Sequence, residues 1–151
     1  MRAKFAISTA CYLFIDNKVL LIKFSKKWGK KYAPIGGKIE EKESPIECMI
    51  REFKEETNCE LVSPKLKGVN YYRQDEQEGI IFIYIATKYK GKMNSSEEGK
   101  LQWVPIEEIS KVEQFEMNSK FTKYLLEEGS FEGKFLLDKD TSVKEYQIRK
   151  I

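Results

Sequence analysis

The stretch GGKIEEKESPIECMIREFKEETNC, residues 36 to 59, carries the strongest structural signal in the chain. Ser44 is a good helix N-cap, Pro45 suits the first helical position, and Glu47 completes a capping box with Ser44. The helical spacing that follows continues to about Thr57. The stretch therefore predicts a capped helix that follows a glycine-containing segment.

Two different faces are expected on this helix. The packing face is expected from four residues at helical spacing, Ile46, Ile50, Phe53 and Thr57. A second stripe carries three carboxylates at i, i+3 and i+4, namely Glu52, Glu55 and Glu56. Because carboxylates this close repel each other, the stripe costs stability unless a cation binds to it.

A metal site on this acidic stripe competes with a simpler interpretation, a solvated helix surface. Considered without its flanks, the stripe is more typical of that surface. The capping box and the glycines in register favour the metal site, and oxygen ligands favour Mg²⁺, Mn²⁺ or Ca²⁺ over zinc. Arg51 is expected to bridge back to Glu43, which would hold the preceding loop against the helix.

These residues also match a known pattern. It reads Gly37, five residues, Glu43, seven residues, Arg51-Glu52-Phe53, one residue, Glu55-Glu56. This spacing resembles the Nudix box of the Nudix hydrolases. The chain departs from the family pattern at Asn58 and Cys59, where Asn58 can still end the helix in the left-handed conformation.

The resemblance implies a fold and a chemistry. The fold is an α/β/α sandwich with a mixed central sheet between helices, formed by one domain over residues 1–151. The implied metal is Mg²⁺, with Mn²⁺ as an alternative, held against a diphosphate by Glu52, Glu55 and Glu56, with the carbonyl of Gly36 as a further ligand. Water then attacks phosphorus. Glu98 resembles the extra loop carboxylate that nucleotide-cleaning relatives use as a ligand or base; Glu97 is its rival, and a polar turn is the alternative for both.

Outside the box, the chain is most similar to the MutT-like subgroup, which hydrolyses oxidised purine nucleoside triphosphates such as 8-oxo-dGTP. By position, Phe115 can stack on a base and Asn118 can read its edge. Phe115 can equally be a core residue and Asn118 the N-cap of a second helix. Tyr32 precedes the glycines in this match, whereas Ala33 replaces a polar residue of some relatives.

Other functions remain open on sequence grounds. The box indicates a metal and a diphosphate but not the leaving groups, so ADP-ribose, dinucleoside polyphosphates, sugar nucleotides and capped RNA are alternative substrates. A non-catalytic nucleotide-binding module is a weaker alternative, because such modules often lose the acidic residues that this chain retains.

Composition narrows the class of protein. The 151 residues are 41% hydrophobic, which suits one compact domain, and the net charge of +3 is too small to indicate a nucleic-acid polymer as partner. Lysines that precede the acidic helix, among them Lys23 and Lys38, are candidates for contacting an anionic nucleotide, although a lysine-rich surface explains them as well. The sequence contains no histidine, so carboxylates must carry the acid–base chemistry.

Three cysteines without paired spacing predict neither a disulfide framework nor a zinc site. The apolar stretch of residues 5–15 is too short to span a membrane. We expect a cytoplasmic enzyme, a monomer or homodimer, that acts on small nucleotides.

Further elements follow from local patterns. β-branched and aromatic residues predict a hairpin of residues 4–15 and 19–24, and a second strand pair of residues 66–74 and 79–89 joined by the acidic turn 75–78. A short strand is expected at 101–104, a helical turn at 105–109, a second helix at 118–128 with Phe121, Leu125 and Leu126 packed, and two strands around residues 138–140.

Overall fold

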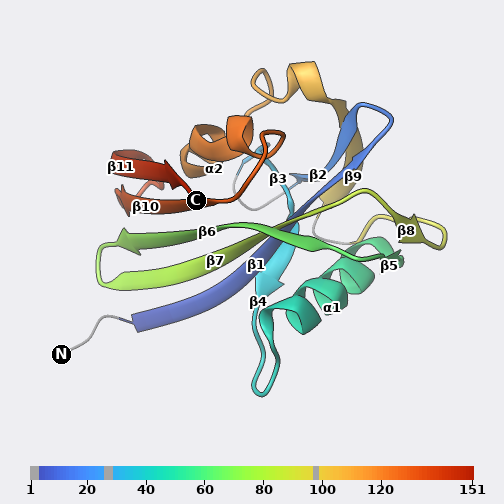
Figure 1. Ribbon diagram of the computed structural model, residues 1–151, viewed down its shortest axis with the longest axis horizontal. Helices are drawn as coiled ribbons and strands as arrows, with labels where there is room; N and C mark the ends of the chain where they lie inside the picture. Colours follow the sequence, from blue (N-terminus) through green and yellow to red (C-terminus); the bar gives the residue numbers. More distant parts are fainter. Residues whose placement is uncertain (1–3, 26–28, 97–98) are drawn as a thin grey trace.

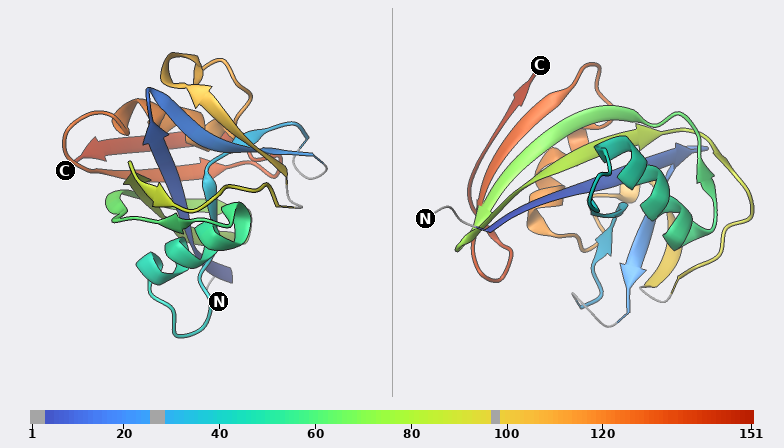
Figure 2. Two further views of the ribbon diagram at one scale, coloured as in Figure 1. Left: turned by 90° about the vertical axis from the view of Figure 1, so that its right-hand side faces the viewer. Right: turned by 90° about the horizontal axis from the view of Figure 1, so that it is seen from below.

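The computed structural model describes residues 4–25, 29–96 and 99–151. In chain order its elements are β1 Lys4–Ile15, β2 Lys18–Phe24, β3 Tyr32–Ala33, β4 Ile35–Lys38, α1 Pro45–Thr57, β5 Glu60–Leu61, β6 Lys65–Gln74, β7 Gln77–Ala86, β8 Tyr89–Lys90, β9 Gly99–Pro105, the 3₁₀ turn η1 Ile106–Glu108, α2 Glu116–Phe121, the 3₁₀ turn η2 Thr122–Tyr124, β10 Phe131–Leu137 and β11 Val143–Lys150. Within these residues a mixed sheet runs in the order β11-β10-β6-β7-β1-β2-β3, with β4 paired to β1 and β9 paired to β2. The helix α1 covers one face of this sheet and α2 covers the other (Figures 1 and 2).

The strand β1 is the centre of the sheet and serves both layers. It runs parallel to β7 and antiparallel to β4, so its middle is paired on both edges. Cys11 and Leu13 point to the core beneath α1, whereas Ala10 and Tyr12 point to the core beneath α2. This alternation explains why the strand is apolar on both faces.

The expected hairpins are present, but β7 ends at Ala86 instead of residue 89 and the turn before β7 differs from expectation. Asp16 and Asn17 adopt positive φ values of 51° and 63° between β1 and β2, which is the geometry of a two-residue hairpin turn. The turn after β6 is shorter than expected: Gln74 pairs with Gln77, so only residues 75–76 lie outside the ladder. Glu78 belongs to β7 and is buried.

The helix α1 begins and ends where the sequence predicts, but its buried face is shifted. Phe53 and Thr57 are buried as expected, while Ile50 is 39% exposed. Met49 takes the position in the core that Ile50 was expected to fill. The buried face of the helix therefore lies closer to the acidic stripe than the sequence pattern predicts. As a result, Glu56 is only 6% exposed.

The second helix differs most from expectation. Instead of residues 118–128, α2 covers Glu116–Phe121 and the chain then tightens into η2. The Ser119 hydroxyl donates to the Glu116 carbonyl at 2.6 Å, and such side-chain bonds compete with regular helix hydrogen bonds. Phe121 and Leu125 are buried, but Leu126 is exposed.

Two further observations concern the cysteines and the length of the helices. Cys11, Cys48 and Cys59 are buried free thiols. Among the described residues, no helix is both long enough and apolar enough to cross a membrane.

Candidate functional site

The site is built around the connection from β4 to α1. The Ser44 hydroxyl accepts a hydrogen bond from the Glu47 backbone N–H at 3.3 Å, and the Glu47 carboxylate accepts one from the Ser44 N–H at 2.9 Å. Asn58 ends the helix with φ 65°, as its position predicts. This capping fixes the helix axis and therefore the direction in which the acidic stripe faces.

Arg51 clamps the loop before α1 onto the helix. Its Nε donates to Glu43 Oε2 at 2.6 Å and its Nη2 donates to Glu43 Oε1 at 3.0 Å, a bidentate pair. Nη2 also donates to the Lys38 carbonyl at 3.1 Å, at the end of β4. The expected bridge between Arg51 and Glu43 is thus present, and it ties together strand, loop and helix.

The same guanidinium also reaches the acidic stripe. Arg51 Nη1 donates to Glu52 Oε1 at 2.9 Å and to the Glu55 carboxylate at 3.3 Å. The Glu52 side chain is 15% exposed and that of Glu55 is 57% exposed, so the two span the boundary between protein and solvent. Glu56 lies beside them on the buried side of the helix.

Gly36 and Gly37 bring the backbone of β4 against both β1 and the acidic stripe. A Cβ atom on Gly36 would lie 2.0 Å from the Thr9 carbonyl oxygen of the paired strand. A Cβ atom on Gly37 would lie 2.3 Å from the Glu52 carboxyl carbon. The Glu52 carboxylate is therefore packed directly on the glycine backbone.

Replacing Gly37 with alanine is expected to lower kcat/KM by about tenfold with little change in the melting temperature. The added methyl group meets the end of a flexible side chain, so the fold can adjust while the Glu52 carboxylate is displaced; a misplacement of about 1 Å can cost up to 10²-fold. Steady-state kinetics and thermal melting measure both effects. Gly29→Ala is the control for the kinetics alone: a Cβ there meets no atom within 4 Å, but the φ of 67° strains an alanine and lowers stability. Equal kcat/KM values for the two variants would contradict the assigned contact.

The donor set of this helix fits a divalent cation. Within the described parts of the chain, no three His, Cys, Asp or Glu side chains are gathered closely enough to form a finished metal site. Glu52 and Glu55 nevertheless share one cationic group, the Nη1 of Arg51, which shows that their oxygens can face a single positive charge. Carboxylate and carbonyl oxygens are the ligands that Mg²⁺ and Mn²⁺ prefer.

The paired hydrogen bonds between Arg51 and Glu43, called the clamp below, lower the pKa of Glu43. Hydrogen bonds from Arg51 and from the Glu40 backbone hold the pKa of the Glu43 carboxyl at about 2, below its ordinary value of 4.5. The same partnership raises the pKa of the Arg51 guanidinium. The clamp is therefore fully charged throughout the neutral and mildly acidic range.

This acidity predicts a pH dependence. Because the folded-state pKa of Glu43 is depressed, its stabilising contribution is complete above about pH 4.5 and is lost as the pH falls toward about 2. The melting temperature of Glu43→Gln should therefore lie below that of the wild type at neutral pH and converge with it near pH 2. Glu41→Gln alters an exposed carboxylate in the same loop and should follow the wild-type curve. A constant gap between wild type and Glu43→Gln down to pH 2 would rule out this linkage.

A cavity of about 380 Å³ opens beside the glycines, on the α2 side of the sheet. Gly36 lines one part of its wall, and Phe115 and Asn118 line another. The segment before α2 is held there because the Tyr32 N–H donates to the Glu113 carbonyl at 2.7 Å. The cavity volume lies within the range of small-molecule sites. The remaining lining residues are Ser8, Thr9, Ala10, Ala33, Pro34, Tyr72, Gln74, Ile81, Ile83, Met117, Leu137 and Thr141.

The structure places both predicted base-reading residues on this cavity. Phe115 is half-buried, packs against the α1-side core and lies under the Lys31 ammonium, 5.6 Å from its ring centre. Asn118 is not an N-cap, because α2 begins at Glu116 and Phe115 occupies the cap position. The Asn118 side chain makes no hydrogen bond to other described residues, so its amide is not used to cap the helix.

The other predicted substrate residues lie around this site. The Tyr32 hydroxyl donates to Gln102 Oε1 at 3.1 Å. The Lys23 ammonium lies over the Tyr32 ring, 5.5 Å from the ring centre. Lys38 lies exposed at the end of β4 and uses its carbonyl to hold Arg51. Glu97 and Glu98 lie outside the described residues.

The sequence did not reveal several residues of the site. Cys48 lies behind the glycines, with its sulfur 3.3 Å from the Thr9 hydroxyl, and burial raises the pKa of its thiol. Tyr72 and Gln74 reach the cavity from β6, and Thr141 reaches it from the turn between β10 and β11. Their local patterns are ordinary strand and turn sequences; only the alternation along β6, which places residues 72 and 74 on one face, points to a shared surface.

Comparison with known proteins extends these observations. A NUDIX domain model matches residues 4–128. The uncharacterized Nudix hydrolase YvcI of Bacillus subtilis (strain 168) is 31% identical over 147 residues, which cover 93% of this chain and 92% of YvcI. Among solved structures, the MutT protein of Bacillus halodurans superimposes with a TM-score of 0.87 at 27% identity, covering 95% of this chain and 97% of that one. The NUDIX domain of Shewanella oneidensis NrtR, solved with ADP-ribose, gives a TM-score of 0.67 at 17% identity, covering 84% of this chain and 91% of that domain.

Proposed function

The chain belongs to the Nudix hydrolase family, and from that premise we propose that it is a metal-dependent nucleoside triphosphate pyrophosphohydrolase. Its proposed substrate is an oxidised purine nucleotide such as 8-oxo-dGTP, which water cleaves to the monophosphate and pyrophosphate. One observation carries the proposal: a single cavity extends from Gly36, next to the acidic helix, to Phe115 and Asn118. We propose that residues 1–151 act as one domain in this reaction.

The proposed metal ligands are the oxygens of the acidic helix and of β4. Glu52, Glu55 and Glu56 would hold Mg²⁺, or Mn²⁺, together with the carbonyl of Gly36. When bound, such an ion neutralises charge that develops on phosphate oxygens and lowers the pKa of a water ligand. Arg51 keeps the helix and loop in a fixed relation, and Glu43 holds Arg51 in its orientation. Glu98 is proposed as an additional ligand or base, with Glu97 as its rival.

The proposed nucleotide orientation places the phosphates at Gly36 and the base between β6 and α2. Phe115 would contact the face of the base, and the Asn118 amide would pair with its polar edge through one donor and one acceptor. Lys38 would contact the phosphates near the acidic helix, while Lys23 and Tyr32 would support the neighbouring wall. The apolar remainder of the lining supports burial of a planar base.

A substrate panel tests this proposal. In Mg²⁺, pyrophosphate release from 8-oxo-dGTP should exceed release from dGTP, and its kcat/KM should exceed the kcat/KM for hydrolysis of ADP-ribose, dinucleoside polyphosphates, sugar nucleotides and capped RNA. ADP-ribose is an essential competitor because a structural relative binds it. Equal or faster turnover of any competitor would overturn the substrate assignment while leaving anhydride hydrolysis intact. If no nucleotide is cleaved with Mg²⁺ or Mn²⁺, the enzyme assignment itself fails.

A further inference from the structure

The turn between β10 and β11, residues 138–142, closes one end of the proposed base pocket. Thr141 of this β10–β11 turn lines the cavity together with Leu137 at the end of β10. The Thr141 backbone N–H donates to the Asp138 carbonyl at 3.0 Å, but its hydroxyl makes no hydrogen bond to another described residue. Thr141, whose hydroxyl is not used within the described residues, therefore belongs to the wall of a largely apolar cavity.

The β10–β11 turn is fastened to the other walls of the same cavity. Gln74, itself a lining residue, donates from Nε2 to the Asp138 carbonyl at 2.9 Å. On the other side, the Glu116 carboxylate of α2 accepts a hydrogen bond from the Val143 N–H at 2.5 Å. The position of Thr141 relative to Asn118 is thus fixed through both β6 and α2.

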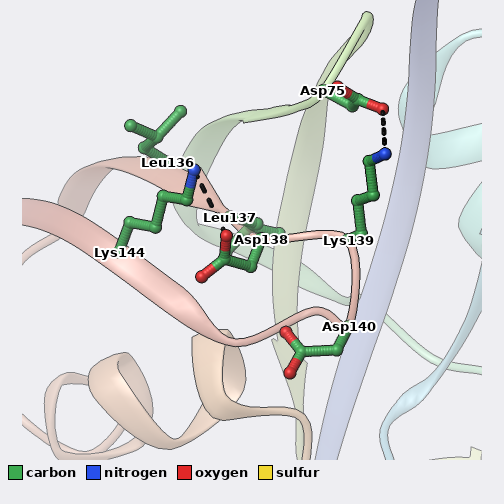
Figure 3. Close-up of a pocket in the computed structure, with 7 residues that line it drawn as sticks. All are labelled: Asp75, Leu136, Leu137, Asp138, Lys139, Asp140 and Lys144. Carbon is green, nitrogen blue, oxygen red and sulfur yellow. Dashed lines mark ion pairs between the residues drawn. The ribbon is translucent and has the colours of Figure 1, made fainter.

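Charged residues of the turn form ion pairs with Asp75 and with Lys144 of β11. Lys139 pairs with Asp75 at 3.9 Å and Lys144 pairs with Asp138 at 3.2 Å (Figure 3). Asp140 points away from the Lys139–Asp75 pair and accepts hydrogen bonds from Ser142 at 2.6 and 3.1 Å. Those bonds lower the pKa of Asp140, and the charge of Lys31 adds to the effect. The turn therefore reaches the neighbourhood of Lys31, the residue that covers Phe115.

The backbone of Thr141 is strained. Its φ of 72° lies in the left-handed region, which a β-branched residue rarely adopts. Such strain persists where surrounding contacts hold it and is frequent at ligand sites. A glycine would fit this turn without strain, so packing within the turn does not explain a threonine here.

We propose that Thr141 is a specificity-determining residue whose hydroxyl reads the polar edge of a purine base, opposite Asn118. The inference rests on the proposed function, because it assumes that the cavity holds the base. The β10–β11 turn would thus contribute to substrate choice, although it lies about 85 residues from the acidic helix in the chain. In this role the hydroxyl would accept a hydrogen bond from the N7–H donor that oxidation at C8 creates on a purine.

Binding of 8-oxo-dGMP and dGMP by calorimetry tests this assignment without requiring catalysis. Thr141→Val keeps the branched shape and removes the hydroxyl, so it should weaken binding of the preferred nucleotide by about five- to tenfold and bring the two affinities closer. Thr141→Ser should stay within about twofold of the wild type, because it keeps the hydroxyl. Thr141→Gly should lose affinity like Thr141→Val while its melting temperature stays equal to that of the wild type or rises. Ser63→Gly is the matched control: an exposed residue with φ 48°, where relief of strain should leave both affinities unchanged.

Each other outcome has a defined meaning. Wild-type affinities in Thr141→Val overturn the role of Thr141, and the proposed function stands if the wild type still cleaves 8-oxo-dGTP. Binding that depends on Thr141 in a protein that cleaves no triphosphate supports the pocket and refutes the proposed function. If neither monophosphate binds the wild-type protein, the inference about Thr141 is wrong.

Discussion

Glu56→Gln is expected to lower kcat by about 10²- to 10³-fold, the largest loss that we predict for a single carboxylate. Replacing a charged ligand by a neutral isostere removes roughly 3–4 kcal/mol of transition-state stabilisation, and each 1.4 kcal/mol corresponds to a factor of ten. Glu56 is 6% exposed, so water screens its charge less than that of its half-exposed neighbour Glu55. Single-turnover hydrolysis in saturating Mg²⁺ measures the effect.

A stability readout separates this catalytic role from a structural one. The rise in melting temperature that Mg²⁺ produces in the wild type should shrink in Glu56→Gln, because the variant lacks one charged ligand. Glu60→Gln makes the same chemical change at an exposed position in β5 and should alter kcat by less than about twofold. If Glu56→Gln retains kcat within about threefold of the wild type, Glu56 is not a ligand.

Features that depend on neighbouring residues could be predicted from the sequence. The capping box of Ser44 and Glu47 and the left-handed Asn58 follow from short-range rules, and the structure has all three. The bridge from Arg51 to Glu43 also follows, because both ends lie within one loop and one helix. The family resemblance extended this local picture to a mixed sheet between helices, which the structure and its likeness to MutT of Bacillus halodurans confirm.

Features that depend on distant packing could not be predicted in the same way. Helical periodicity does not distinguish well between Met49 and Ile50 as the core residue, because they are adjacent in the helix. Packing against the strands determines that Met49 is buried and Ile50 is exposed. The break after Phe121 coincides with hydrogen bonds from the Ser119 and Thr122 hydroxyls to backbone carbonyls, a type of bond that competes with helix hydrogen bonds. The cavity needs β1, β6, β7, α2 and the β10–β11 turn together, so no local pattern contains it.

Arg51→Ala is expected to affect stability and activity together. The substitution removes the arginine charge from Glu43 and Glu52, whose side chains are 13% and 15% exposed, and also its pair with Glu55. Breaking a largely buried pair on one side costs about 3 kcal/mol, which corresponds to a fall of about 6–12 °C in melting temperature for a chain of this size. Because the loop before α1 also loses its bond from Arg51 to the Lys38 carbonyl, kcat/KM should fall by about 10²-fold.

Two further variants, Arg51→Lys and Arg73→Ala, test whether the stabilisation by Arg51 comes from its hydrogen-bond geometry or only from its charge. Lysine keeps the positive charge but cannot reproduce the paired hydrogen bonds to Glu43, so Arg51→Lys should recover less than half of the lost stability. Arg73 is half-exposed and pairs with Glu78 at 3.6 Å, but Glu78 also accepts a hydrogen bond from the Tyr71 hydroxyl at 2.8 Å. Because Glu78 keeps that partner, Arg73→Ala should change the melting temperature by less than about 3 °C. Full recovery by Arg51→Lys would mean that a point charge is sufficient, and a melting temperature for Arg51→Ala as high as that of Arg73→Ala would mean that the clamp adds no net stability. Our expectation is the opposite in both cases, because one guanidinium donates to three carboxylates and a backbone carbonyl that lie on a strand, a loop and a helix.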